Sequence, residues 1–277
     1  MSATAPAVRA NAGEEPMLRF EAAWRETKGA RPYQEDSAAI WPGSALFLPA
    51  NEYAEPDRLV VVLADGMGGH IGGALASRTA CESFLTAFAH SNAAIVERLK
   101  QALAEANRAI ARKVADNPKL SGMGSTLVGA SFGPAGMEWI SIGDSPLYLY
   151  RYGEIAPLNE DHSLAPALDR LALEGKMTAA EAKNHPYRHM LRAAVTGEEL
   201  DLVDFSRRPL AFEPGDCVVL ASDGILTLDA AEIARVISAS QAEGVEAVAA
   251  ALIRAVENAR DPYQDNATVI VVRPLAV

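Results

Sequence analysis

Apolar and polar positions along the chain follow two periods, which predict both strands and helices. Short runs that are almost wholly β-branched or leucine occur at 59–63, 218–221 and 268–272. Such runs are typical of strands that are buried on both faces. A further strand is predicted to begin at 20–24, and the runs 138–142 and 147–152 are two more candidates.

The last two runs are separated only by Gly143-Asp144-Ser145-Pro146. A parallel crossover needs a dozen or more residues, whereas antiparallel neighbours can be joined by a short turn. The sequence therefore predicts that 138–142 and 147–152 form an antiparallel pair.

Helical periodicity appears in several longer segments, at 74–89, at 95–114 and at 245–259. In the second segment one stripe is apolar and the other positions are charged, as expected for a helix that packs on a sheet. Another helix is predicted to begin at Asp229, since Glu232 three residues later completes a capping box. Helices packed on antiparallel strands predict an α+β layered domain.

Two segments differ in composition from the rest of the chain. Residues 1–16 are rich in Ala, Pro, Gly and Glu, and we expect a disordered tail followed by a single domain over 17–277. Residues 162–200 are polar, with signals for short helices near 174–181. We interpret them as a flap that is inserted over one edge of the domain.

The composition excludes some classes of function. Of the 277 residues 49% are hydrophobic and 22% charged, which is typical of a folded globule. The formal net charge of -11 argues against a nucleic-acid partner. No apolar run approaches the roughly 20 residues that cross a bilayer, so we expect a cytoplasmic protein without a membrane partner. Cys81 and Cys217 do not suggest a disulfide framework.

Carboxylates recur at the ends of the predicted strands. A single Asp-Gly after a strand is usually only a turn. Several carboxylates that converge on one end of a sheet would repel one another unless a cation lies between them. Oxygen ligands without His or Cys suit magnesium or manganese better than zinc. The residues in these positions are Glu35, Asp36, Asp65, Asp144, Asp223 and Asp265.

The glycine-rich stretch Asp65-Gly66-Met67-Gly68-Gly69-His70 permits two interpretations. The spacing fails the dinucleotide fingerprint, because Ile71 stands where the third glycine is needed, and no Gly-Lys-Ser/Thr follows as in a P-loop. The remaining interpretation is that the glycines bring the backbone close to a metal at Asp65, with the Gly66 carbonyl as a further ligand.

Taken together in their order along the chain, these motifs resemble those of the metal-dependent, type 2C-like (PPM) serine/threonine protein phosphatases, and bacterial members above all. The likeness runs from about residue 20 to about residue 273. The motifs are Arg31-Pro32-Tyr33-Gln34-Glu35-Asp36, Asp65-Gly66-Met67-Gly68-Gly69-His70, Gly124-Ser125-Thr126, Gly143-Asp144-Ser145, Asp161-His162-Ser163, Ser222-Asp223-Gly224 and Asp265-Asn266.

The resemblance implies a four-layer αββα sandwich, in which two antiparallel sheets are flanked by helices. It also implies two Mn²⁺ or Mg²⁺ ions and attack on phosphate by a hydroxide that bridges them. Asp65 would bridge the ions, with the Gly66 carbonyl on one of them. Asp223 and Asp265 would complete the other site.

The family likeness assigns the remaining residues by position. Glu35 and Asp36 would hold metal-bound waters, and Asp144 would form a weaker third metal site with Asp223. Arg31 would bind the substrate phosphate, since a guanidinium matches phosphate oxygens bidentately. His70 would be the general acid for the leaving alkoxide. Residues 162–205 would be a flap that influences substrate choice.

The implied partners are phosphorylated proteins and a serine/threonine kinase that the enzyme opposes, with the phosphatase acting as a monomer. Two positions depart from the family pattern: Gln34 replaces the usual Asn, and Pro146 stands where many members have Arg. Two alternatives stay open at this point. One is a pseudophosphatase that only binds partners. The other is a phosphatase for a small phosphate ester or a phosphorylated anti-sigma antagonist.

Overall fold

The structure is a computed structural model that describes residues 19–42, 57–68 and 71–275. The predicted tail at 1–16 and the predicted general acid His70 lie outside the described residues. None of the helices within the described ranges is long and apolar enough to cross a membrane.

One sheet contains five strands, and every neighbouring pair in it is antiparallel. In spatial order the strands are β1 (Arg19–Thr27), β11 (Ala267–Leu275), β10 (Cys217–Ala221), β7 (Leu147–Arg151) and β8 (Glu154–Pro157).

The other sheet is also antiparallel and contains six strands, of which the short β4 (Gly124–Ser125) pairs with the end of β3. The remaining strands, in spatial order, are β2 (Asp36–Trp41), β3 (Leu59–Met67), β5 (Leu127–Gly133), β6 (Gly136–Ile142) and β9 (Asp204–Phe205).

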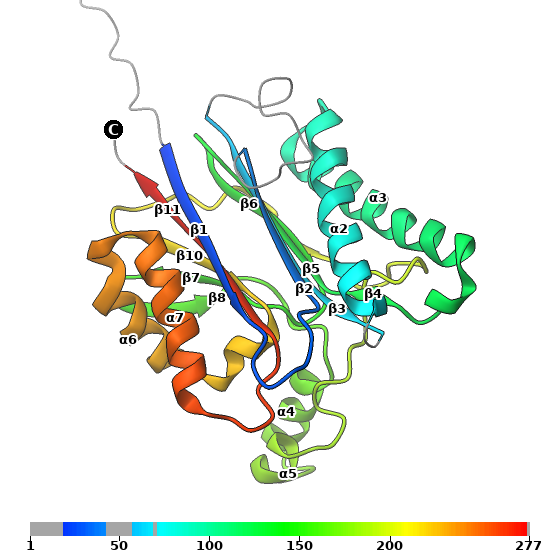
Figure 1. The fold of residues 1–277 in the computed structure, drawn as a ribbon. Coiled ribbons are helices and arrows are strands. Elements are labelled where there is room, and N and C mark those ends of the chain that lie inside the picture. The colour runs from blue at the N-terminus through cyan, green and yellow to red at the C-terminus, as the bar shows by residue number, and fades with distance from the viewer. Residues whose placement is uncertain (1–18, 43–56, 69–70, 276–277) are drawn as a thin grey trace, which may run out of the picture.

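Helices cover the outer face of each sheet, as Figure 1 shows. Helices α2 (Ile71–His90) and α3 (Ile95–Asp116) pack on the six-stranded sheet. Helices α6 (Ala230–Ser240) and α7 (Val245–Ala259) pack on the five-stranded sheet. The predicted αββα sandwich is therefore confirmed. Short 3-10 helices complete the described elements: η1 (Pro118–Leu120), η2 (Asp223–Thr227) and η3 (Gln241–Glu243).

The layers explain why the central strands are apolar at every position. Successive side chains of a strand point to opposite faces. On β3, Val60, Val62 and Ala64 pack against α2 and α3, while Val61 and Leu63 pack against the facing sheet. Both faces of each sheet are covered, so the alternation that marks a half-exposed strand is lost.

The predicted pairing of 138–142 with 147–152 is wrong. Strand β6 pairs with β5 and β9, whereas β7 pairs with β10 and β8 in the other sheet. Stacked sheets lie about 10 Å apart, and a four-residue link spans up to about 13 Å, so this short connection can cross between layers. Gly143, with a φ of +103°, makes the bend. The crossing places Asp144 where the two sheets meet.

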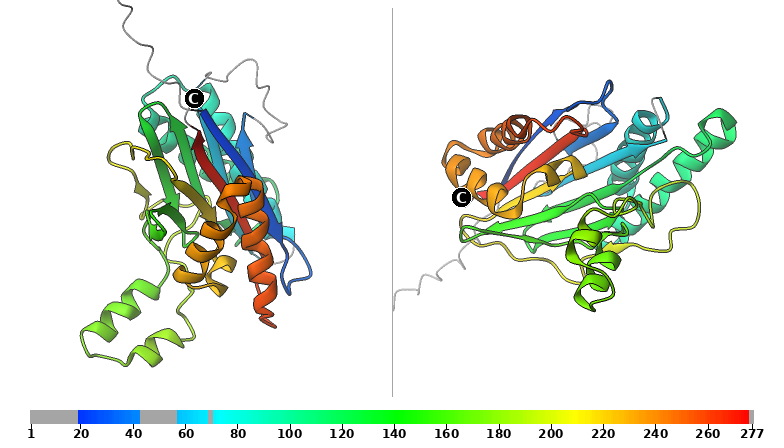
Figure 2. Two further views of the ribbon diagram at one scale, coloured as in Figure 1. Left: turned by 90° about the vertical axis from the view of Figure 1, so that its left-hand side faces the viewer. Right: turned by 90° about the horizontal axis from the view of Figure 1, so that it is seen from below.

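The predicted flap contains two short helices, α4 (Ala165–Leu173) and α5 (Ala179–Lys183), which extend away from the sandwich in Figure 2. Thr178 and Glu181 form a capping box at the start of α5. A backbone bridge between Ser163 and Leu191 joins the two ends of the flap. A second bridge, between Ser125 and Val195, attaches the flap to the sandwich. Its end enters the six-stranded sheet as β9, which pairs with β6.

Candidate metal centre

A cleft of about 690 Å³ opens at the end of the sandwich next to the flap. It is bounded by loops of both sheets on one side and by flap residues, including His189 and Arg192, on the other. Seven of the nine residues predicted for the site line it. They are Arg31, Glu35, Asp65, Gly66, Asp144, Asp223 and Asp265.

Asp65 is held inside a strand, although the sequence suggested that the strand ends before it. Strand β3 continues to Met67, because β2 pairs on one side of its end and β4 on the other. The backbone N–H of Asp65 donates to the Thr126 hydroxyl at 3.0 Å, and its carbonyl accepts from the Ser125 hydroxyl at 2.8 Å. This backbone is fixed, so the Asp65 carboxylate projects from a rigid position directly opposite Asp36.

Glu35 lies against the first turn of α2, and glycine is required around it. A Cβ on Gly73 would lie 2.5 Å from Glu35 Oε1, and a Cβ on Gly66 would lie 2.1 Å from the Gly73 carbonyl oxygen. The Gly66 N–H donates to the Glu35 carbonyl at 3.2 Å. The two glycines therefore allow β3, the Glu35 loop and the helix to meet at the cleft.

Asp36 is buried below the cleft instead of lining it. Its Oδ2 accepts hydrogen bonds from the hydroxyls of Ser222 and Thr268, both at 2.7 Å. Burial raises the pKa of Asp36 to about 7, and the two hydroxyl donors only partly oppose the shift. The other oxygen, Oδ1, is buried without a hydrogen-bond partner.

The pKa values of the neighbouring carboxylates are raised as well. Burial, followed by repulsion from Asp36 and Asp223, raises the pKa of Asp65 well above its usual value. Burial and then Asp223 raise the pKa of Asp144 to about 7. Burial and Asp265 raise the pKa of Asp223, which His189 of the flap partly offsets. Above pH 7 the cleft thus gathers negative charges that disfavour one another.

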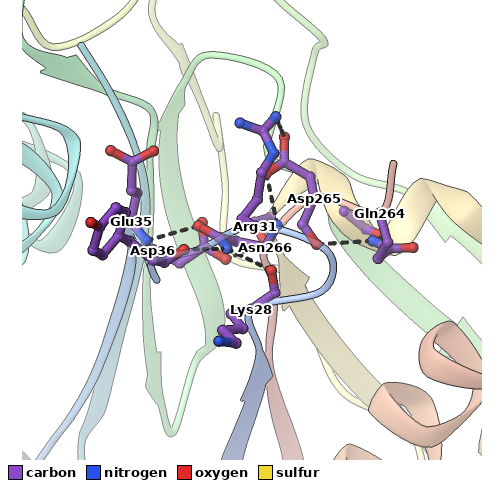
Figure 3. A network of polar contacts seen from close by, with 10 residues as sticks. Lys28, Arg31, Glu35, Asp36, Gln264, Asp265 and Asn266 are labelled. Atoms are coloured by element: carbon purple, nitrogen blue, oxygen red, sulfur yellow. Dashed lines mark hydrogen bonds and ion pairs between the residues drawn. The ribbon is translucent and has the colours of Figure 1, made fainter. Parts of the chain in front are cut away.

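Arg31 provides a positive charge at the rim. Its Nη2 lies 2.6 Å from Oδ2 of Asp265, as Figure 3 shows. The loop that carries Arg31 is held by Asn266, whose side chain accepts from the Glu35 N–H at 2.8 Å and donates to the carbonyls of Lys28 and Tyr33. Arg31 and Asp265 are half-exposed, so this ion pair is open to exchange with ligands in the cleft.

The donor set fits divalent cations. Oxygens of Glu35, Asp36 and Asp223 are buried with no hydrogen-bond partner, which is costly unless something else satisfies them. Among the described residues no group of three or more His, Cys, Asp or Glu side chains is already drawn around a single point.

Sequence reasoning missed several residues that support the site. Ser222 and Thr268 hold Asp36, Thr126 holds the Asp65 backbone, and Asn266 joins two loops. Ser222, Thr126 and Asn266 adjoin or belong to the motifs that marked the carboxylates, which is the signal that pointed to them. His189 lies in the polar flap, where no pattern distinguished it.

Comparison with known proteins agrees with this architecture. A family model described as Stage II sporulation protein E (SpoIIE) matches residues 55–274. The serine/threonine phosphatase stp of Listeria innocua is 30% identical over 215 residues, which are 76% of this chain and 79% of that protein. The chain belongs to the bacterial PPM family of serine/threonine protein phosphatases, within the range matched by the SpoIIE model.

The serine/threonine protein phosphatase PstP of Mycobacterium tuberculosis is 35% identical over 171 residues, which cover 60% of this chain but only 31% of PstP. A crystal structure of the catalytic domain of PstP in complex with two manganese ions has a TM-score of 0.72 at 28% identity. That match covers 93% of this chain and 99% of the solved one. The likeness therefore extends over the whole sandwich.

Proposed function

We propose that this chain is an active phosphatase that hydrolyses phosphoserine and phosphothreonine in proteins, and so opposes a serine/threonine kinase. The observation that carries the proposal is the cleft itself. Carboxylates from widely separated segments converge there, buried oxygens of Glu35 and Asp223 have no hydrogen-bond partner, and Arg31 lies at the rim. The relatives named as serine/threonine phosphatases support the same reading.

In this proposal Asp65, Asp223 and Asp265 hold a pair of divalent cations, with the Gly66 carbonyl beside Asp65. Such a pair, when bound, supplies Lewis-acid activation of water for in-line attack at phosphorus. Asp144 contributes to a weaker third site together with Asp223. Glu35 and Asp36 orient water from below, a role that suits the fixed hydrogen bonds of Asp36 to Ser222 and Thr268.

Arg31 is proposed to bind the substrate phosphate. Its guanidinium pairs with Asp265 at 2.6 Å. If Asp265 held a cation instead, the forked N–H groups of Arg31 could donate hydrogen bonds to two phosphate oxygens. His70 is proposed to donate a proton to the leaving serine or threonine oxygen, because imidazole exchanges protons near neutral pH.

The test is hydrolysis of a phosphothreonine peptide by the purified protein with Mn²⁺, with Mg²⁺ and with a chelator. We expect turnover with Mn²⁺ or Mg²⁺ and none above background in chelator, since the proposed activation of water depends on the cations. A folded protein that shows no turnover with either metal would favour the pseudophosphatase. Turnover of a small phosphate ester but not of the peptide would favour the other alternative.

A further inference from the structure

The link that carries Asp144 is held from the base of the flap by a buried histidine. His162, the first residue of the flap, is only 4% exposed. Its backbone N–H donates to the Gly143 carbonyl at 3.0 Å, and its ring Nδ1 accepts from the Gly143 N–H at 3.3 Å. His162 thus holds both polar backbone groups of the residue that precedes Asp144.

The link has little room to move on its other side. A Cβ on Gly143 would lie 2.6 Å from Cγ2 of Thr126, so the backbone is in close contact there. The Thr126 hydroxyl lies 2.7 Å from the Ser145 hydroxyl, and Asn159 Nδ2 donates to the Ser145 carbonyl at 3.0 Å. Asp144 therefore sits between two anchored residues, of which Gly143 is anchored by His162.

The same histidine also contacts the returning end of the flap. The His162 carbonyl accepts from the Arg192 N–H at 2.8 Å, and the next residue, Ser163, forms a backbone bridge with Leu191. Leu191 and Arg192 line the cleft. His162 therefore joins both ends of the flap to the link at Asp144.

The contact with Gly143 defines how the ring of His162 is used. Nδ1 accepts a hydrogen bond, so it carries no proton, and in the neutral ring the proton lies on Nε2. Burial lowers the pKa of His162, which favours this neutral form. Among the described residues, those that line the cleft do not include His162. Its effect on the carboxylate must therefore pass through Gly143.

We propose that His162 is a positioning residue, which holds the Asp144 carboxylate at the weaker third cation site by fixing the Gly143 backbone. The inference rests on the proposed function, in which Asp144 contributes to that site, and it adds the residue that sets the affinity. Removing a hydrogen-bond partner that orients a metal ligand commonly weakens metal binding by about 10- to 100-fold. The bond of His162 to Arg192 makes the flap part of the same unit.

The experiment measures Mn²⁺ binding by equilibrium dialysis over a range that separates a tight pair of ions from a weaker one. Asp144→Asn should abolish the weaker site and so identifies it. His162→Gln places its end group near the position of Nε2 and lacks an acceptor at Nδ1, so it should weaken that site by about tenfold or more. His162→Asn keeps an oxygen near the position of Nδ1 and should restore most of the affinity.

The tight pair should keep its affinity in both His162 variants, a selectivity that general damage to the fold would not produce. His185 provides a matched control, because its Nδ1 accepts from the Tyr187 N–H at the same distance of 3.3 Å, but within the flap. His185→Gln should leave both classes of site unchanged. Melting curves in chelator check that each variant is folded.

Hydrogen exchange in the wild type tests the same coupling, should His162→Gln fail to fold. Coupling between two binding events is reciprocal, so a cation at the weaker site should strengthen the bonds that hold the link. Exchange of the Gly143 and Arg192 amides should slow when Mn²⁺ is raised from the level that fills the tight pair to the level that fills the weaker site. Asp144→Asn should show no such change.

The outcomes are distinct. The role of His162 is overturned, while the two-metal phosphatase stands, if the wild type binds only the tight pair or if the weaker site is equally strong in folded His162→Gln. A loss in His162→Asn as large as in His162→Gln, or amide exchange that ignores the weaker site, overturns it as well. Folded wild type that neither binds Mn²⁺ nor hydrolyses a phosphothreonine peptide overturns the proposed function itself.

Discussion

Replacing Asp65 with asparagine is expected to lower kcat on a phosphothreonine peptide by at least about 10³-fold. The proposed role of Asp65 is to bridge both cations, and losing one such contact removes several kcal/mol of transition-state stabilisation, at about 1.4 kcal/mol for each factor of ten. Asparagine has nearly the same size as aspartate. The difference in kcat at saturating Mn²⁺ therefore reports mainly the loss of the negative charge.

The same substitution should not weaken the fold before a cation binds. Burial and the neighbouring carboxylates raise the pKa of Asp65, so the ionised side chain is unfavourable there, and a neutral amide removes that repulsion. We expect an equal or higher melting temperature in chelator. Asp201→Asn is the matched control, because Asp201 lines the outer cleft and has no proposed role at the metals. A variant of Asp65 with nearly full activity would contradict the proposed bridge.

The largest effect on stability is expected at a different place, from Asp216→Ala. Asp216 is fully buried and accepts from Nε and Nη2 of Arg151 at 2.8 and 2.6 Å, and from the Glu213 N–H at 2.8 Å. The substitution removes two hydrogen bonds of Arg151, which keeps Glu213 at 2.6 Å as its remaining ion pair, and it leaves the Glu213 N–H without its acceptor. We expect the free energy of unfolding to fall by about 2–3 kcal/mol, measured by urea denaturation.

Arg188 and Asp169 in the flap form a second bidentate ion pair, which is more exposed to solvent. Arg188 donates to both oxygens of Asp169 at 2.7 and 2.8 Å, but the Asp169 side chain is 53% exposed. Asp169→Ala should cost less than about 1 kcal/mol. Similar losses at Asp169 and Asp216 would show that burial does not set the value of these pairs.

Local chemistry predicted the strand runs, the main helices and an α+β layered domain, and the family resemblance implied the αββα order of the layers. Asp229 and Glu232 form the expected capping box, and Asp265-Asn266 immediately precede β11. The positions of the carboxylates in the cleft also follow their motifs, because each motif lies at the end of a strand whose direction the fold fixes.

The sequence did not predict which sheet a strand would join. The link at Gly143 is as short as a hairpin turn, yet β6 pairs with β5 and β9 in one sheet while β7 pairs with β8 and β10 in the other. The partners of Asp36 were missed because they come from distant segments of the chain. Thr268 is 232 positions away from it, and only the folded register brings their oxygens together.

The ion pair of Arg31 with Asp265 was also unforeseen, although both residues were predicted for the site. The family likeness assigns one to phosphate and the other to a metal. If both proposed roles hold, a cation at Asp265 would compete with Arg31 for the same carboxylate. A cation bound at Asp265 would free Arg31 to bind phosphate, and a phosphate bound by Arg31 would free Asp265 to bind a cation.

The most direct test of the account is the number of Mn²⁺ ions that the chain binds, measured by equilibrium dialysis and by electron paramagnetic resonance. The titration is best made near pH 8, because Asp36 and Asp144 have pKa values raised to about 7 and protons would compete below that. The account predicts two magnetically coupled ions per wild-type chain and loss of the coupling in Asp65→Asn. Folded wild-type protein that binds no Mn²⁺, or only one ion unaffected by Asp65→Asn, would contradict it.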